Sequence, residues 1–167
     1  TDVSGADGKH RSVSVTSRAV GIETGNGNNT IVNDGGGVIA VEARDLPISY
    51  SCQGSGSCAP PQTVAIGILA GTGHDVVVNE GQLSAHTIST SGAATRGVAI
   101  DTGAGDDRVV LGTGSLTVGD ISLGGGDDRF VWSSNAGLTG GVAPGTGIDT
   151  FALGGKASDT IALDTLD

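Results

Sequence analysis

The chain has 167 residues, a length that favours a single domain. It holds 31 glycines but only two Phe, one Trp and one Tyr, which excludes an ordinary core of large side chains, while dense runs of Val, Ile and Leu argue against disorder. The 18 acidic and 8 basic side chains give a formal net charge of −10, so the chain would repel a phosphate backbone and we expect no nucleic-acid partner.

The N-terminal residues carry little structural pattern. Residues 1–16 are rich in Asp, Ser and Lys with few apolar positions, and we expect a cap or a linker there. The chain opens without a basic and apolar signal segment, contains no Met, and has no stretch of the roughly 18 to 20 apolar residues that would span a bilayer. We therefore expect a processed or excised piece of a longer protein.

From residue 17 onward the chain repeats a short glycine motif, GxGx[DN]xU, in which U is apolar. Five segments carry it: residues 24–32, 70–78, 102–110, 123–131 and 144–152. Their second glycines are 46, 32, 21 and 21 residues apart, and GGKASDTIA near the C-terminus is a degenerate sixth copy. The preceding residues repeat too, since SRAVGIETGNGNN is similar to TRGVAIDTGAGDD. Each unit predicts a strand, a tight glycine turn, a second strand and a return segment.

The longest interval between motifs contains an unusual segment, residues 45–62, which includes DLPISYSCQGSGSCAPP and three of the four prolines. We expect an inserted loop there. Cys52 and Cys58 are close enough in sequence to form a disulfide worth about 2 to 3 kcal/mol, the alternative being two free thiols in a flexible loop. Because loops on rigid scaffolds often bind partners, Tyr50 and Gln53 are candidate contact residues; the alternative is a solvated insertion without a partner.

The repeat predicts the fold. One unit cannot bury its apolar face alone, but it can when copies stack about 4.8 Å apart. We therefore expect an all-β fold with negligible helix: a single-stranded parallel β-helix, or solenoid, with coils of about 21 residues and one or more inserted loops. Residues 1–167 would form one such domain.

Alternation along the strands assigns side chains to columns. The first inward column contains Ile31, Val77, Val109, Phe130, Phe151 and Ile161. The second contains Leu111, Trp132, Leu153 and Leu163, with Asn33 and Asn79 as an internal amide stack. The outward column contains Thr30, Val76, Arg108, Arg129, Thr150 and Thr160.

Acidic side chains follow the corner glycines and would also stack. One column contains Asn29, Asp75, Asp107, Asp128 and Asp149, and a second contains Asp106 and Asp127. Uncompensated carboxylates about 5 Å apart repel by roughly 1 kcal/mol in water and by several at an effective dielectric constant near 20. These columns therefore require a compensating interaction.

Three interactions can compensate the carboxylates. Backbone N–H groups of the turn can donate hydrogen bonds to them. Arg108 and Arg129 can form ion pairs, which would be exposed and individually weak. Calcium can bridge the column at Asp107, Asp128 and Asp149. Calcium is the one cofactor that the sequence suggests.

The same side-chain types occur in polysaccharide-active β-helix enzymes, where acids bind calcium or act as a general base and an arginine holds a uronate. The residues that fit those roles are Asp106, Asp107, Asp127, Asp128, Arg108 and Arg129. They recur with the repeat, as architecture alone would produce, and His10, His74 and His86 are scattered. We expect no enzyme and no catalytic residue. An ice-binding face would need regular Thr columns, and Thr30, Thr150 and Thr160 are too interrupted.

The corner motif is similar to the calcium-binding RTX repeat, GGxGxDxUx, of secreted bacterial proteins. RTX motifs recur every nine residues so that paired half-sites enclose an ion, whereas this motif recurs every 21 in its best-registered part. The RTX resemblance implies a calcium-binding module.

Long coils, GxGDD corners and a single close cysteine pair look more like a passenger-domain fragment of a bacterial autotransporter, over residues 17–165. This resemblance implies an extracellular or outer-membrane-surface location and an adhesive or virulence role. The implied partners are a host-cell or matrix surface, or other copies through the β-helix surfaces and ends. Membrane attachment would come only from a separate translocator barrel outside this fragment. A short disulfide ring would be a minor obstacle to export through a narrow pore.

Overall fold

The computed structural model describes residues 16–45, 62–90, 92 and 94–154. Every regular element in these ranges is a β-strand, which confirms the all-β prediction for them. They contain no helix long and apolar enough to cross a membrane. Most of the expected cap and of the 45–62 insertion lies outside the described residues, as do the sixth motif copy and the residues Tyr50, Cys52, Gln53, Cys58, Ile161 and Leu163.

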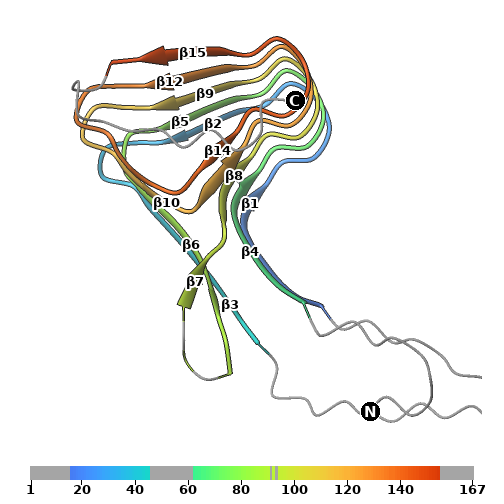
Figure 1. Cartoon of the computed structure of the whole chain (residues 1–167), viewed down its shortest axis with the longest axis vertical. Coiled ribbons are helices and arrows are strands. Elements are labelled where there is room, and N and C mark those ends of the chain that lie inside the picture. The colour runs from blue at the N-terminus through green and yellow to red at the C-terminus, as the bar shows by residue number, and fades with distance from the viewer. Residues whose placement is uncertain (1–15, 46–61, 91, 93, 155–167) are drawn as a thin grey trace, which may run out of the picture.

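The strands form three sheets of mainly parallel strands (Figure 1). In spatial order, the first sheet contains β1 (Thr16–Glu23), β4 (Gln62–Leu69), β8 (Val98–Asp101), β11 (Asp120–Ser122) and β14 (Val142–Ala143). The second contains β2 (Thr30–Asn33), β5 (Val76–Asn79), β9 (Arg108–Leu111), β12 (Arg129–Trp132) and β15 (Thr150–Leu153). The third contains β3 (Val38–Arg44), β6 (Gln82–Ile88), β10 (Leu116–Val118) and β13 (Gly137–Thr139), and β7 (Ala94–Arg96) pairs antiparallel with β6.

The chain visits the first, second and third sheets in turn and then repeats the circuit, so each sheet stacks its strands in chain order. We call one such circuit a coil. The strands β9, β12 and β15 begin at residues 108, 129 and 150, which preserves the 21-residue period of the sequence. This stacked parallel order is consistent with a β-helix.

Two of the sheets extend well beyond the stacked coils (Figure 1). β1 and β4 have eight residues and β3 and β6 have seven, whereas β10, β11 and β13 have three. The extensions pack on each other through a second, small-residue core of Val41, Ala43, Ala65 and Ala85. The 21-residue period did not predict this extension, because the extended strands lie in the earlier coils, where the motifs are 46 and 32 residues apart.

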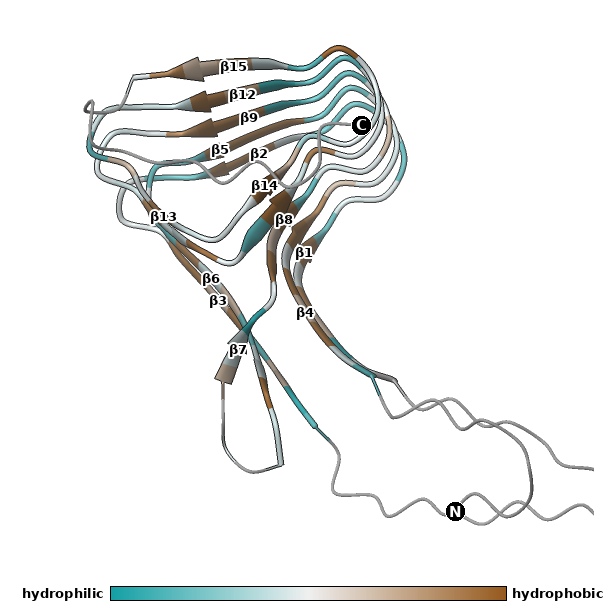
Figure 2. Ribbon diagram, viewed as in Figure 1, coloured by the Kyte–Doolittle hydropathy of each residue, from teal (hydrophilic) through white to brown (hydrophobic). Residues whose placement is uncertain are grey.

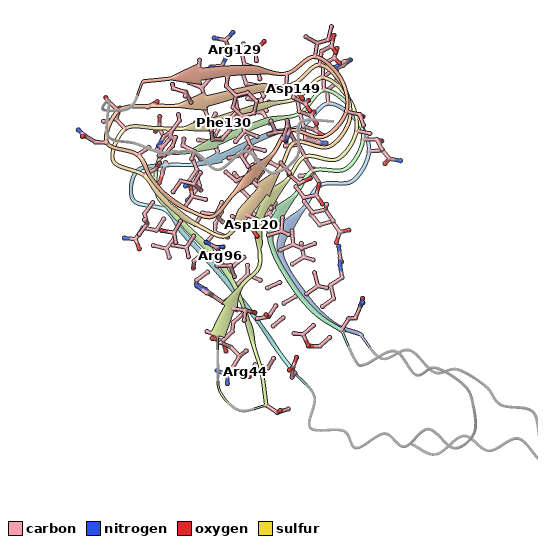
Figure 3. The ribbon with its side chains drawn as sticks, in the orientation of Figure 1. Arg44, Arg96, Asp120, Arg129, Phe130 and Asp149 are labelled. Atoms are coloured by element: carbon pink, nitrogen blue, oxygen red, sulfur yellow. The ribbon has the colours of Figure 1, made fainter. Side chains whose placement is uncertain are left out.

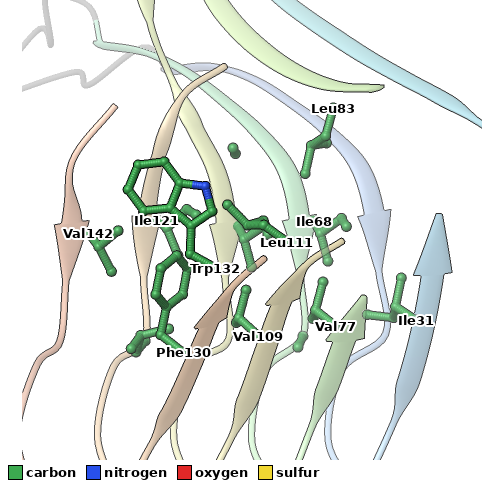
Figure 4. Packing of buried hydrophobic residues seen from close by; sticks show 14 of the residues in the cluster. Ile31, Ile68, Val77, Leu83, Val109, Leu111, Ile121, Phe130, Trp132 and Val142 are labelled. Carbon is green, nitrogen blue, oxygen red and sulfur yellow. The ribbon is translucent and has the colours of Figure 1, made fainter. Parts of the chain in front are cut away.

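The main core is a set of inward columns between the three sheets (Figure 4). Ile31, Val77, Val109 and Phe130 are buried in register along the second sheet, and Phe151 packs against them partly buried. The strands of the stack carry many hydrophobic residues, and hydrophilic residues gather at its corner (Figure 2). The first inward column is therefore confirmed in its described residues.

The second inward column is confirmed at Leu111 and Trp132, which are buried. Leu153 pairs in register with Trp132 and so keeps its place in the column, but it is 59% exposed. It lies on β15, which is the last strand of the second sheet and has a paired neighbour only on the β12 side among the described strands.

The predicted amide stack of Asn33 and Asn79 is confirmed. Asn33 Nδ2 donates to Asn79 Oδ1 at 2.7 Å, and Asn79 Nδ2 donates to the Thr117 hydroxyl at 2.9 Å. All three side chains are buried. This column therefore carries hydrogen bonds in its first two coils and apolar contacts further along, at Leu111.

Replacing Asn79 with Leu is expected to lower the free energy of unfolding by about 2 to 3 kcal/mol, because the buried Thr117 hydroxyl loses its partner and Asn33 Nδ2 keeps only the carbonyl of Gln82. Urea denaturation followed by circular dichroism measures the loss. The triple variant Asn33→Leu/Asn79→Leu/Thr117→Val removes all three polar groups and should recover most of it. An Asn79→Leu protein as stable as the wild type contradicts this assignment.

Candidate functional site

The candidate site is the corner at which the first sheet turns into the second. Every coil turns there through two glycines with positive φ, for example Gly103 at 93° and Gly105 at 127°. A Cβ on Gly103 would lie 1.8 Å from the carbonyl oxygen of Gly71 in the preceding coil. Both the dihedral angle and the close approach of the backbones therefore require glycine.

An inner column of polar side chains follows these glycines. The N–H of Asn29 donates to Asp75 Oδ1 at 2.7 Å, and that of Asp75 donates to Asp107 Oδ1 at 2.7 Å. The N–H of Asp107 donates to Asp128 Oδ1 at 2.8 Å, and that of Asp128 to Asp149 Oδ1 at 2.9 Å. Each carboxylate thus accepts a backbone hydrogen bond from the coil before its own.

An outer column lies beside it, and its hydrogen bonds run in the opposite direction along the stack. The N–H of His74 donates to Asn28 Oδ1 and the N–H of Asp106 donates to His74 Nδ1, at 2.9 and 3.1 Å. The N–H of Asp127 donates to Asp106 Oδ1, at 2.9 Å. Here each side chain accepts from the coil after its own. The two columns therefore link neighbouring coils in both directions at every corner.

The columns differ in burial and so in electrostatics. Asp75, Asp107 and Asp128 are 1%, 2% and 1% exposed, whereas the side chains of Asp106 and His74 are exposed. Burial raises the pKa of Asp107, and it raises the pKa of Asp128 to about 6. Asp75, Asp107 and Asp128 each also have an Oδ2 atom that is buried without a hydrogen-bond partner.

The observed compensation is the first of the three interactions that the sequence suggested, backbone N–H donation to the carboxylate. The donor, however, belongs to the adjacent coil and not to the carboxylate's own turn. Arg108 and Arg129 lie side by side on β9 and β12, and within the described ranges neither forms an ion pair. No group of three or more His, Cys, Asp or Glu side chains in the described part of the chain is placed to hold one metal ion. Calcium at Asp107, Asp128 and Asp149 stays a prediction.

The arginines belong to a different surface, the outward face of the second sheet. Arg129 lies on the outside of the stack, whereas Phe130, the next residue, points inward (Figure 3). Two parallel columns cover this face: Thr30, Val76, Arg108, Arg129 and Thr150 in one, and Val32, Val78, Val110, Val131 and Ala152 in the other. The acids and arginines weighed for an enzyme are thus separated: the acids lie at the corner, where Asp107 and Asp128 are buried, and the arginines lie on the outward face.

Sequence reasoning missed the part played by His74 and Asn28. Both occupy the position just before the motif Asp or Asn, the same column as Asp106 and Asp127, and alignment of the five motifs would have placed them in the outer column. His86 lies on β6, away from the corner, and His10 lies outside the described residues.

No protein-family model, no curated protein and no solved structure matches the chain.

Proposed function

We propose that this chain is a single-stranded parallel β-helix that serves as a structural and adhesive surface outside a bacterial cell. In this proposal it is a passenger fragment of an autotransporter-type secreted protein. The observation that carries the proposal is the in-register stacking of five coils with hydrogen-bonded side-chain columns at each corner. Such stacking gives a rigid scaffold whose outward faces stay available for binding.

The outward face of the second sheet supports the adhesive part. It offers two adjacent exposed arginines beside a column of valines. Arg and apolar side chains are effective at protein interfaces when they present one continuous surface. The expected partner is a host-cell or matrix surface with anionic groups, and neither nucleic acid nor catalysis has a part in the proposal.

Adhesion is tested by binding of the purified chain to cultured cells and to matrix-coated surfaces. Arg108→Glu/Arg129→Glu is expected to weaken binding by about tenfold or more, because it reverses both charges of the face. Arg44→Glu is the matched control, since Arg44 pairs with Glu42 on the extended β3 strand. Tyr50→Ala and Gln53→Ala test the inserted loop separately.

Binding that is absent from the wild-type chain at micromolar concentration contradicts the adhesive role. Binding that is lost in Tyr50→Ala and unchanged in the arginine double variant moves the adhesive surface from the second sheet to the loop. A crystal structure of the chain tests the β-helix itself.

A further inference from the structure

The inner column contains an unusual arrangement of buried carboxyl oxygens. Oδ1 of Asp107 and of Asp128 accepts a backbone hydrogen bond from the preceding coil. Oδ2 of each is buried and has no partner. A buried carboxylate oxygen without a donor is costly, and it is more costly beside further carboxylates of the same column.

Asn29, the first residue of the inner column, indicates which groups surround the position that Oδ2 occupies in the aspartates. Asn29 occupies the same position as the aspartates, with Nδ2 in place of Oδ2. Its Nδ2 donates to the carbonyl of Gly27 at 2.5 Å, to Asp75 Oδ1 at 2.9 Å and, at the longer distance of 3.4 Å, to the carbonyl of Gly25. In the only described coil where this atom is nitrogen, it is therefore a donor, and its two nearest acceptors are a glycine carbonyl and the next carboxylate.

The same two acceptors recur in the aspartate coils. By position, Oδ2 of Asp107 faces the carbonyl of Gly105 and Oδ1 of Asp128. For Asp128 the equivalent acceptors are the carbonyl of Gly126 and Oδ1 of Asp149. No N–H or hydroxyl group in the described part of the chain donates to either glycine carbonyl. An ionised Oδ2 would face these oxygen atoms without a proton to share, whereas a protonated one could donate its single proton to one of the acceptors that Asn29 uses.

We propose that Asp107 and Asp128 are neutral carboxylic acids in the folded protein in mild acid, each carrying its proton on Oδ2, so that the stacked coils are held more tightly there than at neutral pH. Protonation of the corner carboxyl groups then stabilises the contact between neighbouring coils. Asp75 has the same geometry, and Asp149, at the half-buried end of the column, supplies the last carboxylate acceptor.

The surroundings of the two carboxyl groups favour the neutral form. Burial is the largest cause of the raised pKa of Asp107; the hydrogen bond from the Asp75 N–H lowers this pKa, as do Thr102 and His74, and the Asp75 carboxylate raises it. Thr102 donates its own proton to the carbonyl of Leu123 at 2.7 Å. Burial is also the largest cause for Asp128, whose pKa the hydrogen bond from the Asp107 N–H lowers and the carboxylates of Asp107, Asp149 and Asp106 raise.

The expected pH dependence follows for Asp128, whose pKa is 3.8 ordinarily and about 6 in the fold. Below 3.8 both the folded and the unfolded chain hold the proton, and pH has no effect through this group. Between 3.8 and about 6 only the unfolded chain has released it, so the unfolding equilibrium constant rises about tenfold per pH unit, or about a hundredfold in total. Above that range stability stays at its lower level. Asp107 acts in the same direction.

The experiment measures unfolding of the whole chain in urea from about pH 4 to about pH 7.5. The wild type is expected to lose stability as the pH rises. Asp107→Asn and Asp128→Asn keep the acceptor and replace the protonated oxygen with a permanent donor, as in Asn29, so each variant should flatten the curve and be at least as stable as the wild type at neutral pH. Asp127→Asn removes an exposed charge of the outer column and should leave the slope unchanged.

A second measurement does not depend on any variant's stability. The infrared spectrum of the folded wild type at about pH 5 should contain a carboxylic-acid carbonyl band that disappears on unfolding at the same pH. The proposal is overturned if wild-type stability rises with pH over this range, or if Asp128→Asn is less stable than the wild type at neutral pH. It is also overturned if added calcium stabilises the wild type but not Asp128→Asn, because a cation and not a proton then fills the position.

Discussion

Replacing Gly103 with Ala is expected to lower the free energy of unfolding by about 2 to 5 kcal/mol. A side chain at its φ of 93° costs about 1 to 2 kcal/mol. The new Cβ would also lie 1.8 Å from the Gly71 carbonyl oxygen. Because that atom is backbone, relief requires separation of two coils, at an overpacking cost of about 1 to 3 kcal/mol. Urea denaturation followed by far-ultraviolet circular dichroism measures the sum.

Gly114 provides the control for this prediction. Its φ is 80°, yet a Cβ there would meet nothing within 4 Å. Gly114→Ala should therefore cost only the conformational part, about 1 to 2 kcal/mol. Equal losses in the two variants would mean that the close approach of the coils contributes nothing.

Truncation of Phe130 to Ala is expected to cost about 3 to 5 kcal/mol. Phe130 is completely buried in the middle of the first inward column, with its ring centroid 5.7 Å from that of Phe151. The neighbouring coils are fixed to each other by backbone pairing on both sides of β12, so they cannot collapse into the space. The same unfolding measurement applies.

Two further variants provide comparisons for the stability loss of Phe130→Ala. Phe151→Ala should cost less than Phe130→Ala, because Phe151 is only partly buried on the terminal described strand of its sheet. Val131→Ala on the outward face should change stability by less than about 1 kcal/mol. If Phe151→Ala proves as costly as Phe130→Ala, then the end of the second sheet is packed as tightly as its middle.

The columns could be predicted from the sequence because, in a stacked fold, residues at equivalent positions of successive repeats contact each other. Residues 21 positions apart become neighbours on adjacent strands, so the alignment of Val109, Phe130 and Phe151 already contained their packing. Asn33 and Asn79 are 46 residues apart, and their pairing followed from alignment of the first two motifs. These predictions needed only the period and the alternation of a strand.

The hydrogen bonding of the corner could not be predicted in the same way. The sequence places Asp107 and Asp128 in one column, but it does not say whether Oδ1 accepts from its own turn, from the coil before or from the coil after. That choice depends on the side-chain direction at a tight corner. The exposure of Leu153 has a related cause, since the period alone does not say which coil ends a sheet.

The opposite polarities of the two corner columns bear on how the chain folds. A coil such as that of Asp107 presents to the next coil a free N–H in the inner column and a free acceptor, Asp106 Oδ1, in the outer one. Toward the preceding coil it presents the reverse: an inner acceptor, Asp107 Oδ1, and an outer N–H. Either end of a growing stack thus offers one donor and one acceptor, so a nucleus formed at any coil can extend toward both termini with equal ease.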